Sequence, residues 1–456
     1  MALQDILKGV KSIHFIGIGG SGMIAVVQIL KNQGFNITGS DNNESDVVRF
    51  ARSIGINVSM QQKKENINGA DLIIYTEAIL ENNEELLAAK ASGIKTIERN
   101  DFLAYFTKKY NNTICICGTH GKTTTTSMIV TSLLQAKKDP SAIIGGKLNE
   151  IGGYSRIGKT DILVVEACEF NDHFLKLFPD IVVLLNIDND HLEYFKTMDN
   201  LKNSFTKFCK KATKAVIYNG DDLNSKEAVK DILVKTISVG FNEDNDYYAA
   251  DIIKKAGNET VFSVYKNKKK ILKDVKINIP GIFNVLNALA AIVVSLEFNC
   301  FKDDIVSALK SFKGAGRRFE LIGKVNGVTV LDDYAHHPSE VLATLKALKD
   351  CNFNRIWAVH QPFTFSRTNM LKKEFAKALS VADFVVLTEI LGSREENKTG
   401  ISSKDLVKLI PGSVYKKTQE EAKEYVLNNA KDGDVVITMG CGDIYKCAKM
   451  MVHGRY

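Results

Sequence analysis

The feature that most constrains the fold is a glycine-containing turn between a predicted strand and a predicted helix. Residues 113–117 are an apolar, β-leaning run, residues 118–127 read Gly-Thr-His-Gly-Lys-Thr-Thr-Thr-Thr-Ser, and a helical pattern covers 128–134. Backbone N–H groups of such a turn close around a polyphosphate, the lysine reaches the terminal phosphates, and the threonine hydroxyl binds Mg²⁺. Gly118 precedes Lys122 by four residues, where the general pattern has six. The sequence therefore predicts a shortened phosphate-binding loop; the alternative is an ordinary turn before a helix.

Length and the order of predicted elements indicate an α/β protein of three domains. A chain of 456 residues corresponds to about three domains. The first predicted strands lie at 12–16, 35–38, 72–76 and 95–97, before the polar run 108–112. We predict a Rossmann-like domain over residues 1–109.

The rest of the chain divides into two further segments. Short alternating runs over 215–280 predict a small antiparallel sheet beside a mostly parallel one. Later strands are predicted at 329–331, 355–359, 384–387 and 435–439. We predict a central P-loop domain at 110–315 and a second Rossmann-like domain at 316–456.

A second glycine motif opens the chain. Gly17-x-Gly19-x-x-Gly22 follows the strand at 12–16, and Asp41 comes nineteen residues after Gly22. This spacing is the dinucleotide-binding fingerprint, although its physics requires only a diphosphate over a helix N-terminus and an acid near a sugar. NAD and a nucleotide-sugar diphosphate both satisfy it, and tight strand–helix packing is the alternative without a ligand. The P-loop favours the nucleotide sugar.

Acids and histidines follow several predicted strands. Glu166 ends the apolar run 162–165, and His191 follows the strand at 181–185. A carboxylate at a strand end beside a P-loop supplies a second Mg²⁺ contact. Residues 332–338 read Asp-Asp-Tyr-Ala-His-His-Pro directly after a strand, and Arg317-Arg318 precede them. The dense cluster indicates chemistry rather than packing, and the paired arginines suit a phosphate clamp or a solvated turn.

Composition excludes several classes of protein. The net charge is +7, and the one dense basic run, 266–270, is predicted to be a hairpin tip, so we expect no nucleic-acid binding. No run reaches the roughly 18 apolar residues of a membrane span. The eight cysteines show no pairing pattern, which predicts reduced thiols in a cytoplasmic protein.

Taken together, the motifs resemble those of the Mur ligases, over essentially the whole chain. The matching pieces are 14–23 (His-Phe-Ile-Gly-Ile-Gly-Gly-Ser-Gly-Met), 118–127, 166–169 (Glu-Ala-Cys-Glu), 186–191 (Asn-Ile-Asp-Asn-Asp-His), 284–289 (Asn-Val-Leu-Asn-Ala-Leu), 317–320, 332–338 and 366–368 (Ser-Arg-Thr). The second piece and the Asp-Asp-Tyr-Ala-His-His-Pro piece are the most specific.

The resemblance implies an ATP-dependent ligase of peptidoglycan precursor synthesis. Such an enzyme joins L-alanine to the muramyl carboxylate of UDP-N-acetylmuramate through an acyl phosphate. ATP and Mg²⁺, or Mn²⁺, are the implied cofactors, and a monomer or homodimer is the implied assembly. The three domains would bind UDP-sugar, ATP and amino acid in that order.

The resemblance also implies roles for individual residues. The implied UDP-sugar residues are His14, Gly17, Gly19, Gly20, Ser21, Gly22, Met23, Ser40, Asp41 and Thr76. Those for ATP are Gly118, Thr119, His120, Gly121, Lys122, Thr123, Thr124, Asn287, Arg318 and Asp333. Metal is assigned to Thr123, Glu166 and His191, and the amino acid to Tyr334, His336, His337 and Arg367. The implied catalytic set is Lys122, Glu166, His191, Asp333, His336 and Arg367.

The chain also departs from the family pattern. The usual Phe-Gln-Pro-His is His360-Gln361-Pro362-Phe363, the usual histidine before Asn284 is Phe283, and no lysine is assigned to a carbamylated position. These changes affect the amino-acid and adenine contacts and leave the phosphate chemistry intact. A ligase for glycine, serine or a preformed peptide, an NAD-binding oxidoreductase, and a non-catalytic nucleotide-binding module remain the alternatives.

Overall fold

The computed structural model describes residues 6–255, 259–393, 395–454 and 456. Within them the chain clusters into two compact units. The first comprises the described residues of 1–250, 263–275 and 286–312, and the second comprises those of 251–262, 276–285 and 313–456. No described helix is long and apolar enough to cross a membrane.

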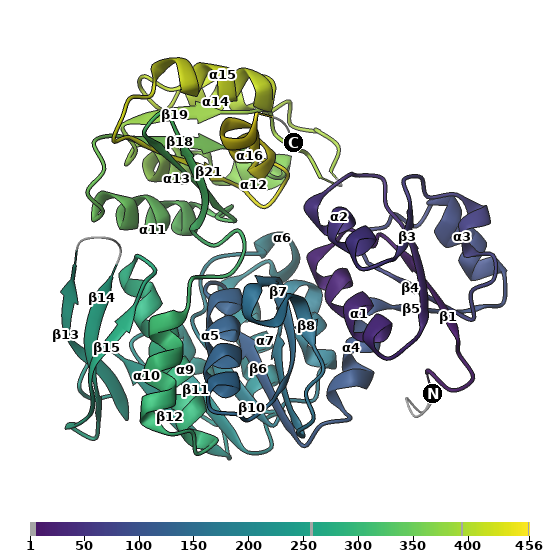
Figure 1. The fold of residues 1–456 in the computed structure, drawn as a ribbon, viewed down its shortest axis with the longest axis horizontal. Helices are drawn as coiled ribbons and strands as arrows, with labels where there is room; N and C mark the ends of the chain where they lie inside the picture. Colours follow the sequence, from purple (N-terminus) through teal and green to yellow (C-terminus); the bar gives the residue numbers. More distant parts are fainter. Residues whose placement is uncertain (1–5, 256–258, 394, 455) are drawn as a thin grey trace. The chain divides into compact units, whose positions relative to one another are not determined.

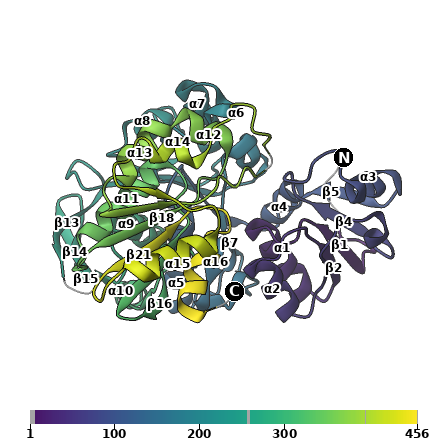
Figure 2. The same ribbon diagram turned by 90° about the horizontal axis from the view of Figure 1, so that it is seen from above.

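The first unit begins with a five-stranded parallel sheet of order β3-β2-β1-β4-β5. Apolar side chains of α1, α2 and α4 cover one face, whereas α3 covers the other (Figures 1 and 2). Its elements are β1 (Ser12–Ile16), α1 (Ser21–Asn32), β2 (Asn36–Ser40), α2 (Asp46–Ser53), β3 (Asn57–Ser59), η2 (Lys64–Ile67), β4 (Leu72–Tyr75), α3 (Glu84–Ala91), β5 (Lys95–Glu98) and α4 (Arg99–Thr107).

A ten-stranded sheet follows, in the order β15-β14-β13-β12-β11-β10-β6-β9-β7-β8. Strands β6, β7 and β9 to β13 pair in parallel, whereas β7 and β8 form an antiparallel pair. The elements up to β10 are β6 (Asn112–Cys117), α5 (Lys122–Gln135), β7 (Ser141–Leu148), η3 (Asn149–Ile151), β8 (Gly153–Arg156), β9 (Ile162–Glu166), η4 (Phe170–Lys176) and β10 (Ile181–Leu184). The later ones are α6 (Leu192–Phe195), α7 (Met198–Cys209), β11 (Ala215–Asn219), α8 (Leu223–Ala228), β12 (Lys235–Gly240), β13 (Tyr247–Lys254), β14 (Thr260–Lys266), β15 (Lys269–Ile277), α9 (Ile282–Glu297) and α10 (Lys302–Ser311).

The last sheet has six strands in the order β16-β17-β21-β18-β19-β20, with β16 and β17 antiparallel and the other pairs parallel. One apolar core lies under α11, α13 and α14, and another under α15 and α16. The elements are β16 (Glu320–Val325), β17 (Val328–Asp333), α11 (Pro338–Lys349), β18 (Ile356–His360), α12 (Phe365–Met370), α13 (Lys372–Leu379), β19 (Phe384–Leu387), α14 (Ser403–Val407), β20 (Val414–Tyr415), α15 (Gln419–Asn429), β21 (Val435–Met439) and α16 (Tyr445–His453).

The predicted fold class is confirmed. The strands expected over 215–280 belong to the ten-stranded sheet, which they extend at one edge. The basic run 266–270 forms the tip between β14 and β15, where Asn267 and Lys268 adopt positive φ. The helix after the P-loop begins at Lys122 rather than at the predicted residue 128.

The amino-terminal sheet is joined to the ten-stranded sheet by a buried amide. Gln28, in the middle of α1, is 8 % exposed, and its Oε1 accepts hydrogen bonds from the N–H groups of Tyr154 (2.9 Å) and Ser155 (3.1 Å). The hydroxyl of Ser155 donates to the carbonyl of Ala25 at 2.7 Å. These bonds satisfy backbone groups of the edge strand β8, so α1 covers that edge of the sheet.

Candidate active site

The phosphate-binding loop connects β6 to α5. Gly121 caps α5 with a φ of 85°, and a Cβ added to it would lie 2.7 Å from Oδ1 of Asn287. Positive φ and this close approach both favour glycine. Thr124 is buried in the first turn of α5. The first N–H groups of α5 therefore lie at the loop, where they suit an anion.

Lys122 is held across its own loop. Its Nζ donates to the carbonyls of Gly118 (2.5 Å) and Thr119 (3.1 Å) and to the carboxylate of Glu169 (2.9 and 3.1 Å). Burial favours the neutral amine, but the carboxylates of Glu169 and Glu166 more than offset this effect and raise the pKa of Lys122 above its usual value. The side chain is therefore a fixed cation.

Thr123 and Glu166 form an oxygen pair beside Lys122. The Thr123 hydroxyl is 3.0 Å from each carboxylate oxygen of Glu166, and the Gly145 N–H donates to Oε2 at 2.8 Å. A hydroxyl and a carboxylate are hard oxygen donors, the type that Mg²⁺ prefers. The two predicted metal residues thus lie together and fit such an ion.

His191, the third predicted metal residue, makes other contacts. Its φ is 55°, its ring packs edge-on against Phe170 at 5.0 Å, and its Nε2 lies 3.7 Å from the carboxylate of Asp190. Because these contacts neither require nor exclude a metal, its role as a ligand stays a prediction.

The segment before His191 is bound to the P-loop. Asn186 accepts from the His120 N–H at 2.8 Å and donates to the His120 carbonyl at 3.1 Å. The Asp188 N–H donates to the Thr119 hydroxyl at 2.9 Å, and Asp188 Oδ2 lies 2.9 Å from His120 Nε2. His120 and Thr119 therefore position the loop, and their contacts with ATP stay predictions.

The amino-terminal glycine turn is ordered by Asp41. Asp41 Oδ2 accepts from the Gly19 N–H at 2.8 Å, and a Cβ on Gly19 would lie 2.7 Å from that same oxygen. Gly17 has a φ of 80°, and a Cβ there would lie 2.8 Å from the Thr76 side chain. Gly20 caps α1, which begins at Ser21. The predicted UDP-sugar residues of this turn therefore share one small region.

Arg99, which the sequence did not single out, lies beside this turn. A Cβ on Gly22 would come within 3.0 Å of its guanidinium, and Arg99 donates to Asn100 Oδ1 at 2.6 Å. Burial lowers its pKa, with an opposing effect from nearby acids, and arginine stays charged in spite of this. A half-buried cation beside a glycine turn suits a diphosphate.

His14 and Ser40 serve the interior of the amino-terminal sheet. His14 is 1 % exposed, with Nδ1 2.8 Å from the Thr38 hydroxyl and Nε2 2.8 Å from Glu85. The Ser40 hydroxyl donates to the same carboxylate at 2.5 Å. Met23 is also buried, on the face of α1 that contributes to the core. Contacts of these three residues with a UDP-sugar stay predictions.

Asp333 ends β17 in a network of backbone donors. Its carboxylate accepts from the N–H groups of Phe319 (2.7 Å) and Ala335 (2.8 Å). Burial raises the pKa of Asp333 to about 6, although Arg318 and the backbone donors oppose the shift. Asp333 is therefore a carboxyl whose charge changes near neutrality.

The adjacent arginines differ in role. Arg317 donates to Asp332 at 3.0 Å and to the carbonyls of Gly440 (2.6 Å) and Gly442 (2.9 Å), so it joins β17 to the loop after β21. Arg318 lies over the Tyr334 ring at 4.7 Å. Arg317 is thus a structural clamp, and the contact of Arg318 with ATP stays a prediction.

The two neighbouring histidines hold the start of α11. His336 Nδ1 lies 3.1 Å from Glu340, and His337 caps the helix, with its Nδ1 2.7 Å from the Ser339 hydroxyl. Arg367 lies in the first turn of α12, where its N–H donates to the Thr364 hydroxyl at 3.4 Å. The amino-acid roles of these three residues stay predictions.

His360, the displaced histidine, is enclosed at the end of β18. It is fully buried, and neither ring nitrogen has a hydrogen-bond partner among the described residues. Burial lowers its pKa to about 4. A neutral imidazole therefore occupies a position in the core, and Phe363 takes the half-exposed place after Pro362.

Comparisons with known proteins agree with this geometry. Residues 12–111 match the Mur ligase family catalytic domain, 116–295 the Mur ligase middle domain, and 317–442 the Mur ligase glutamate ligase domain. The UDP-N-acetylmuramate–L-alanine ligase of Caldicellulosiruptor bescii is 44% identical over 444 residues, which cover 96% of this chain and 97% of that protein. The same enzyme of Clostridium botulinum strain Langeland is 43% identical over 463 residues, covering 99% and 100%.

Two solved structures extend the comparison. The UDP-N-acetylmuramate–alanine ligase of Thermotoga maritima superposes with a TM-score of 0.84 at 27% identity, over 98% of this chain and 99% of that one. A murein peptide ligase of Psychrobacter arcticus superposes with a TM-score of 0.75 at 22% identity, over 97% and 98%, and shares the fold.

Proposed function

The chain belongs to the Mur ligase family, and we propose that it joins L-alanine to the muramyl carboxylate of UDP-N-acetylmuramate at the expense of ATP. The observation that carries the proposal is the paired arrangement at the P-loop. The Lys122 ammonium donates to the carboxylate of Glu169, and the Thr123 hydroxyl donates to the carboxylate of Glu166. The chain that carries these pairs matches L-alanine ligases over nearly its whole length.

The proposed chemistry begins with attack of the muramyl carboxylate on the γ-phosphate of ATP. Lys122 donates to the developing negative charge on the phosphoryl oxygens, and the N–H groups at the start of α5 orient the phosphates. When Lys122 makes this contact, a phosphate oxygen takes the place of the Gly118 and Thr119 carbonyls as the acceptor for its Nζ. Bound Mg²⁺, held by Thr123 and Glu166, would neutralise phosphate charge.

The acyl phosphate is then attacked by the amine of L-alanine. Phosphate leaves from the tetrahedral intermediate, and an amide bond remains. Asp333, with its pKa of about 6, lies at the end of β17 among the residues predicted to meet the amino acid. As a carboxylate above that pH it can accept the proton that the ammonium must lose.

The proposed division of labour follows the predicted boundaries. Residues 1–109 would bind the UDP-sugar, 110–315 ATP, and 316–456 the amino acid. All eight cysteines are free, which supports a cytoplasmic location. The whole-chain likeness favours the ligase over an NAD-binding oxidoreductase or a non-catalytic module.

The variant Arg367→Lys tests the proposed binding site for the amino-acid carboxylate. Replacing it with lysine keeps the charge but loses the planar fork that binds a carboxylate bidentately. KM for L-alanine should rise roughly tenfold, about 1.4 kcal/mol of lost binding, while KM for ATP and for UDP-N-acetylmuramate move much less. Steady-state kinetics with each substrate varied in turn, and with glycine and L-serine in place of L-alanine, measures this.

The matched control is Arg355→Lys, because Arg355 pairs with Asp434 at the other end of β18. It should leave all three KM values unchanged. Equal rises for the three substrates in Arg367→Lys would mean that Arg367 supports domain closure. The carboxylate would then be held elsewhere, with His336 or His337 as the next candidates.

A further inference from the structure

The segment η4 binds two acids at the carboxyl ends of strands of the amino-terminal sheet. His173 Nε2 lies 3.0 Å from the carboxylate of Glu77, which also accepts a hydrogen bond from the Asn171 side chain. The Lys176 ammonium lies 3.3 Å from the carboxylate of Glu98. These acids lie at or just after the ends of β4 and β5, and all of the residues belong to the first unit. Two strand ends of one sheet are therefore bound to the segment that follows β9 of the other.

Each of the two acids is also the chain neighbour of a residue at the amino-terminal glycine turn. Thr76 directly precedes the first acid, and its methyl group would lie 2.8 Å from a Cβ on Gly17. Arg99 directly follows the second, and its guanidinium would lie 3.0 Å from a Cβ on Gly22. A ligand that orders Thr76 and Arg99 at this turn therefore orders the acids that bind η4.

The start of η4 contacts the residues of the phosphate-binding loop. Phe170, its first residue, directly follows Glu169, whose carboxylate accepts from Lys122 at 2.9 Å. The Phe170 ring packs edge-on against two imidazoles, with centroid distances of 6.2 Å to His173 and 5.0 Å to His191. The same segment thus touches the glycine-turn acids on one side and the partner of the P-loop lysine on the other.

Side-chain contacts hold η4 in its shape. Asn171 and Asp172 have φ values of 50° and 58°, a left-handed conformation that is unfavourable for two successive residues other than glycine. Asp172 accepts from the hydroxyl of Tyr194 at 3.0 Å and from that of Ser204. Loss of a contact on the other side of the segment, such as that with Glu77, should therefore change how η4 is held.

We propose that the contact between Glu77 and His173 positions η4, so that a bound nucleotide sugar strengthens the binding of ATP and Mg²⁺ at the phosphate-binding loop. The inference rests on the proposed function, because the two ligands are substrates of that ligase. Order at the glycine turn would pass through the two acids to η4, and from η4 to Glu169 and His191. Such coupling is reciprocal, so the nucleotide and the nucleotide sugar should each strengthen binding of the other.

The test is calorimetry of a non-hydrolysable ATP analogue with Mg²⁺ and the full chain, with and without saturating UDP-N-acetylmuramate. In the wild-type chain the nucleotide sugar should lower the Kd of the analogue by roughly fivefold or more, whereas in His173→Ala the ratio should fall below about twofold. The Kd of each ligand alone should change little in the variant. Failure of either ligand to bind the wild-type chain would overturn the proposed function together with this inference. Binding of both ligands with no effect on each other would overturn the coupling alone.

Two variants of Glu77 separate positioning from a role in the fold. Burial lowers the pKa of His173, although the carboxylates of Glu77 and Glu98 oppose the shift, so near neutrality the ring is an uncharged donor. An amide oxygen can accept that hydrogen bond, so Glu77→Gln should keep the ratio of Kd values that Glu77→Ala loses. A Tm that falls in Glu77→Ala while the ratio stays at the wild-type value would overturn the proposal.

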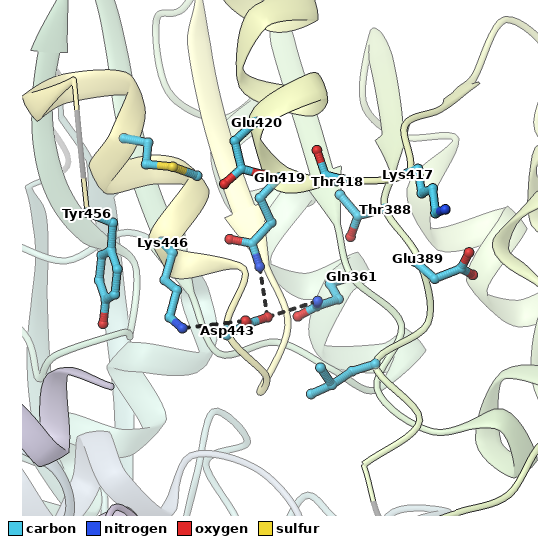
Figure 3. A pocket seen from close by; sticks show the side chains of 12 residues that line it. Gln361, Thr388, Glu389, Lys417, Thr418, Gln419, Glu420, Asp443, Lys446 and Tyr456 are labelled. Carbon is cyan, nitrogen blue, oxygen red and sulfur yellow. Dashed lines mark hydrogen bonds and ion pairs between the residues drawn. The ribbon is translucent and has the colours of Figure 1, made fainter. Parts of the chain in front are cut away.

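The matched control removes one hydrogen bond to a carboxylate in the second unit. Gln419 Nε2 donates to Asp443 at 2.8 Å, and Asp443 keeps Gln361 and Lys446 as partners when Gln419 is replaced (Figure 3). Gln419→Ala should leave the ratio of Kd values at the wild-type value. A loss of coupling as large as that in His173→Ala would overturn the assignment of the coupling to η4.

Discussion

Replacing Lys122 with alanine should lower kcat by on the order of 10³-fold, because the cation that meets the transferring phosphoryl group is lost. The Nζ of Lys122 lies within the loop, where it donates hydrogen bonds to the carbonyls of Gly118 and Thr119 and to the carboxylate of Glu169. Binding of UDP-N-acetylmuramate should persist, since the residues predicted to bind the sugar lie between positions 14 and 76, outside the P-loop. Single-turnover phosphate release and calorimetry with the sugar measure the two effects.

The control for this variant must account for Glu169, the buried carboxylate that pairs with Lys122. Glu169 is 2 % exposed at its side chain, so removing Lys122 alone leaves an unpaired buried carboxylate, which destabilises the fold. The double variant Lys122→Met with Glu169→Gln removes both charges at similar volume. It should restore Tm and remain as slow as Lys122→Ala. Near-normal turnover in either variant would contradict the assignment of residues 118–127 as a phosphate-binding loop.

Glu166→Gln should lower kcat by on the order of 10²-fold and raise the Mg²⁺ concentration needed for half-maximal rate. The amide keeps the shape of the carboxylate and can still accept from the Gly145 N–H, but it is a weak ligand for a hard cation. Initial rates over a Mg²⁺ titration, repeated with Mn²⁺, measure the change and compare the two metals.

The matched control is Asp161→Asn, directly before β9, where the carboxylate accepts from Asn111 at the surface. It should leave both kcat and the metal dependence unchanged. A Glu166→Gln enzyme with a lower kcat and an unaltered Mg²⁺ titration would show that Glu166 acts by holding Thr123 rather than by binding metal.

Local sequence patterns predicted the strands well where the buried residues are consecutive in the sequence. The strands at 12–16, 384–387 and 435–439 have the predicted bounds, because short runs rich in apolar residues fit parallel strands covered on both faces. The helix after the P-loop was predicted to begin at residue 128, and it begins at Lys122. Four successive threonines have weak helix propensity, and their burial in the fold overrides it.

Contacts between residues that are far apart in the sequence could not be predicted from local motifs. Glu169 lies 47 positions from Lys122, and only the folded sheet brings β9 beside β6. Arg99 approaches the glycine turn from a separate helix, so no motif links the two. The adjacent arginines read alike in sequence, yet Arg317 has the buried partner Asp332 and Arg318 lies on Tyr334. Chemistry could be predicted residue by residue, but the pairing of charges required the fold.

The central claim is tested most directly by phosphate release from ATP and Mg²⁺ with UDP-N-acetylmuramate and each amino acid in turn. We expect one phosphate per ATP consumed only when the nucleotide sugar and L-alanine are both present, with the product carrying one added alanine. Phosphate release that requires no nucleotide sugar would contradict the account. So would release supported by a preformed peptide and not by L-alanine.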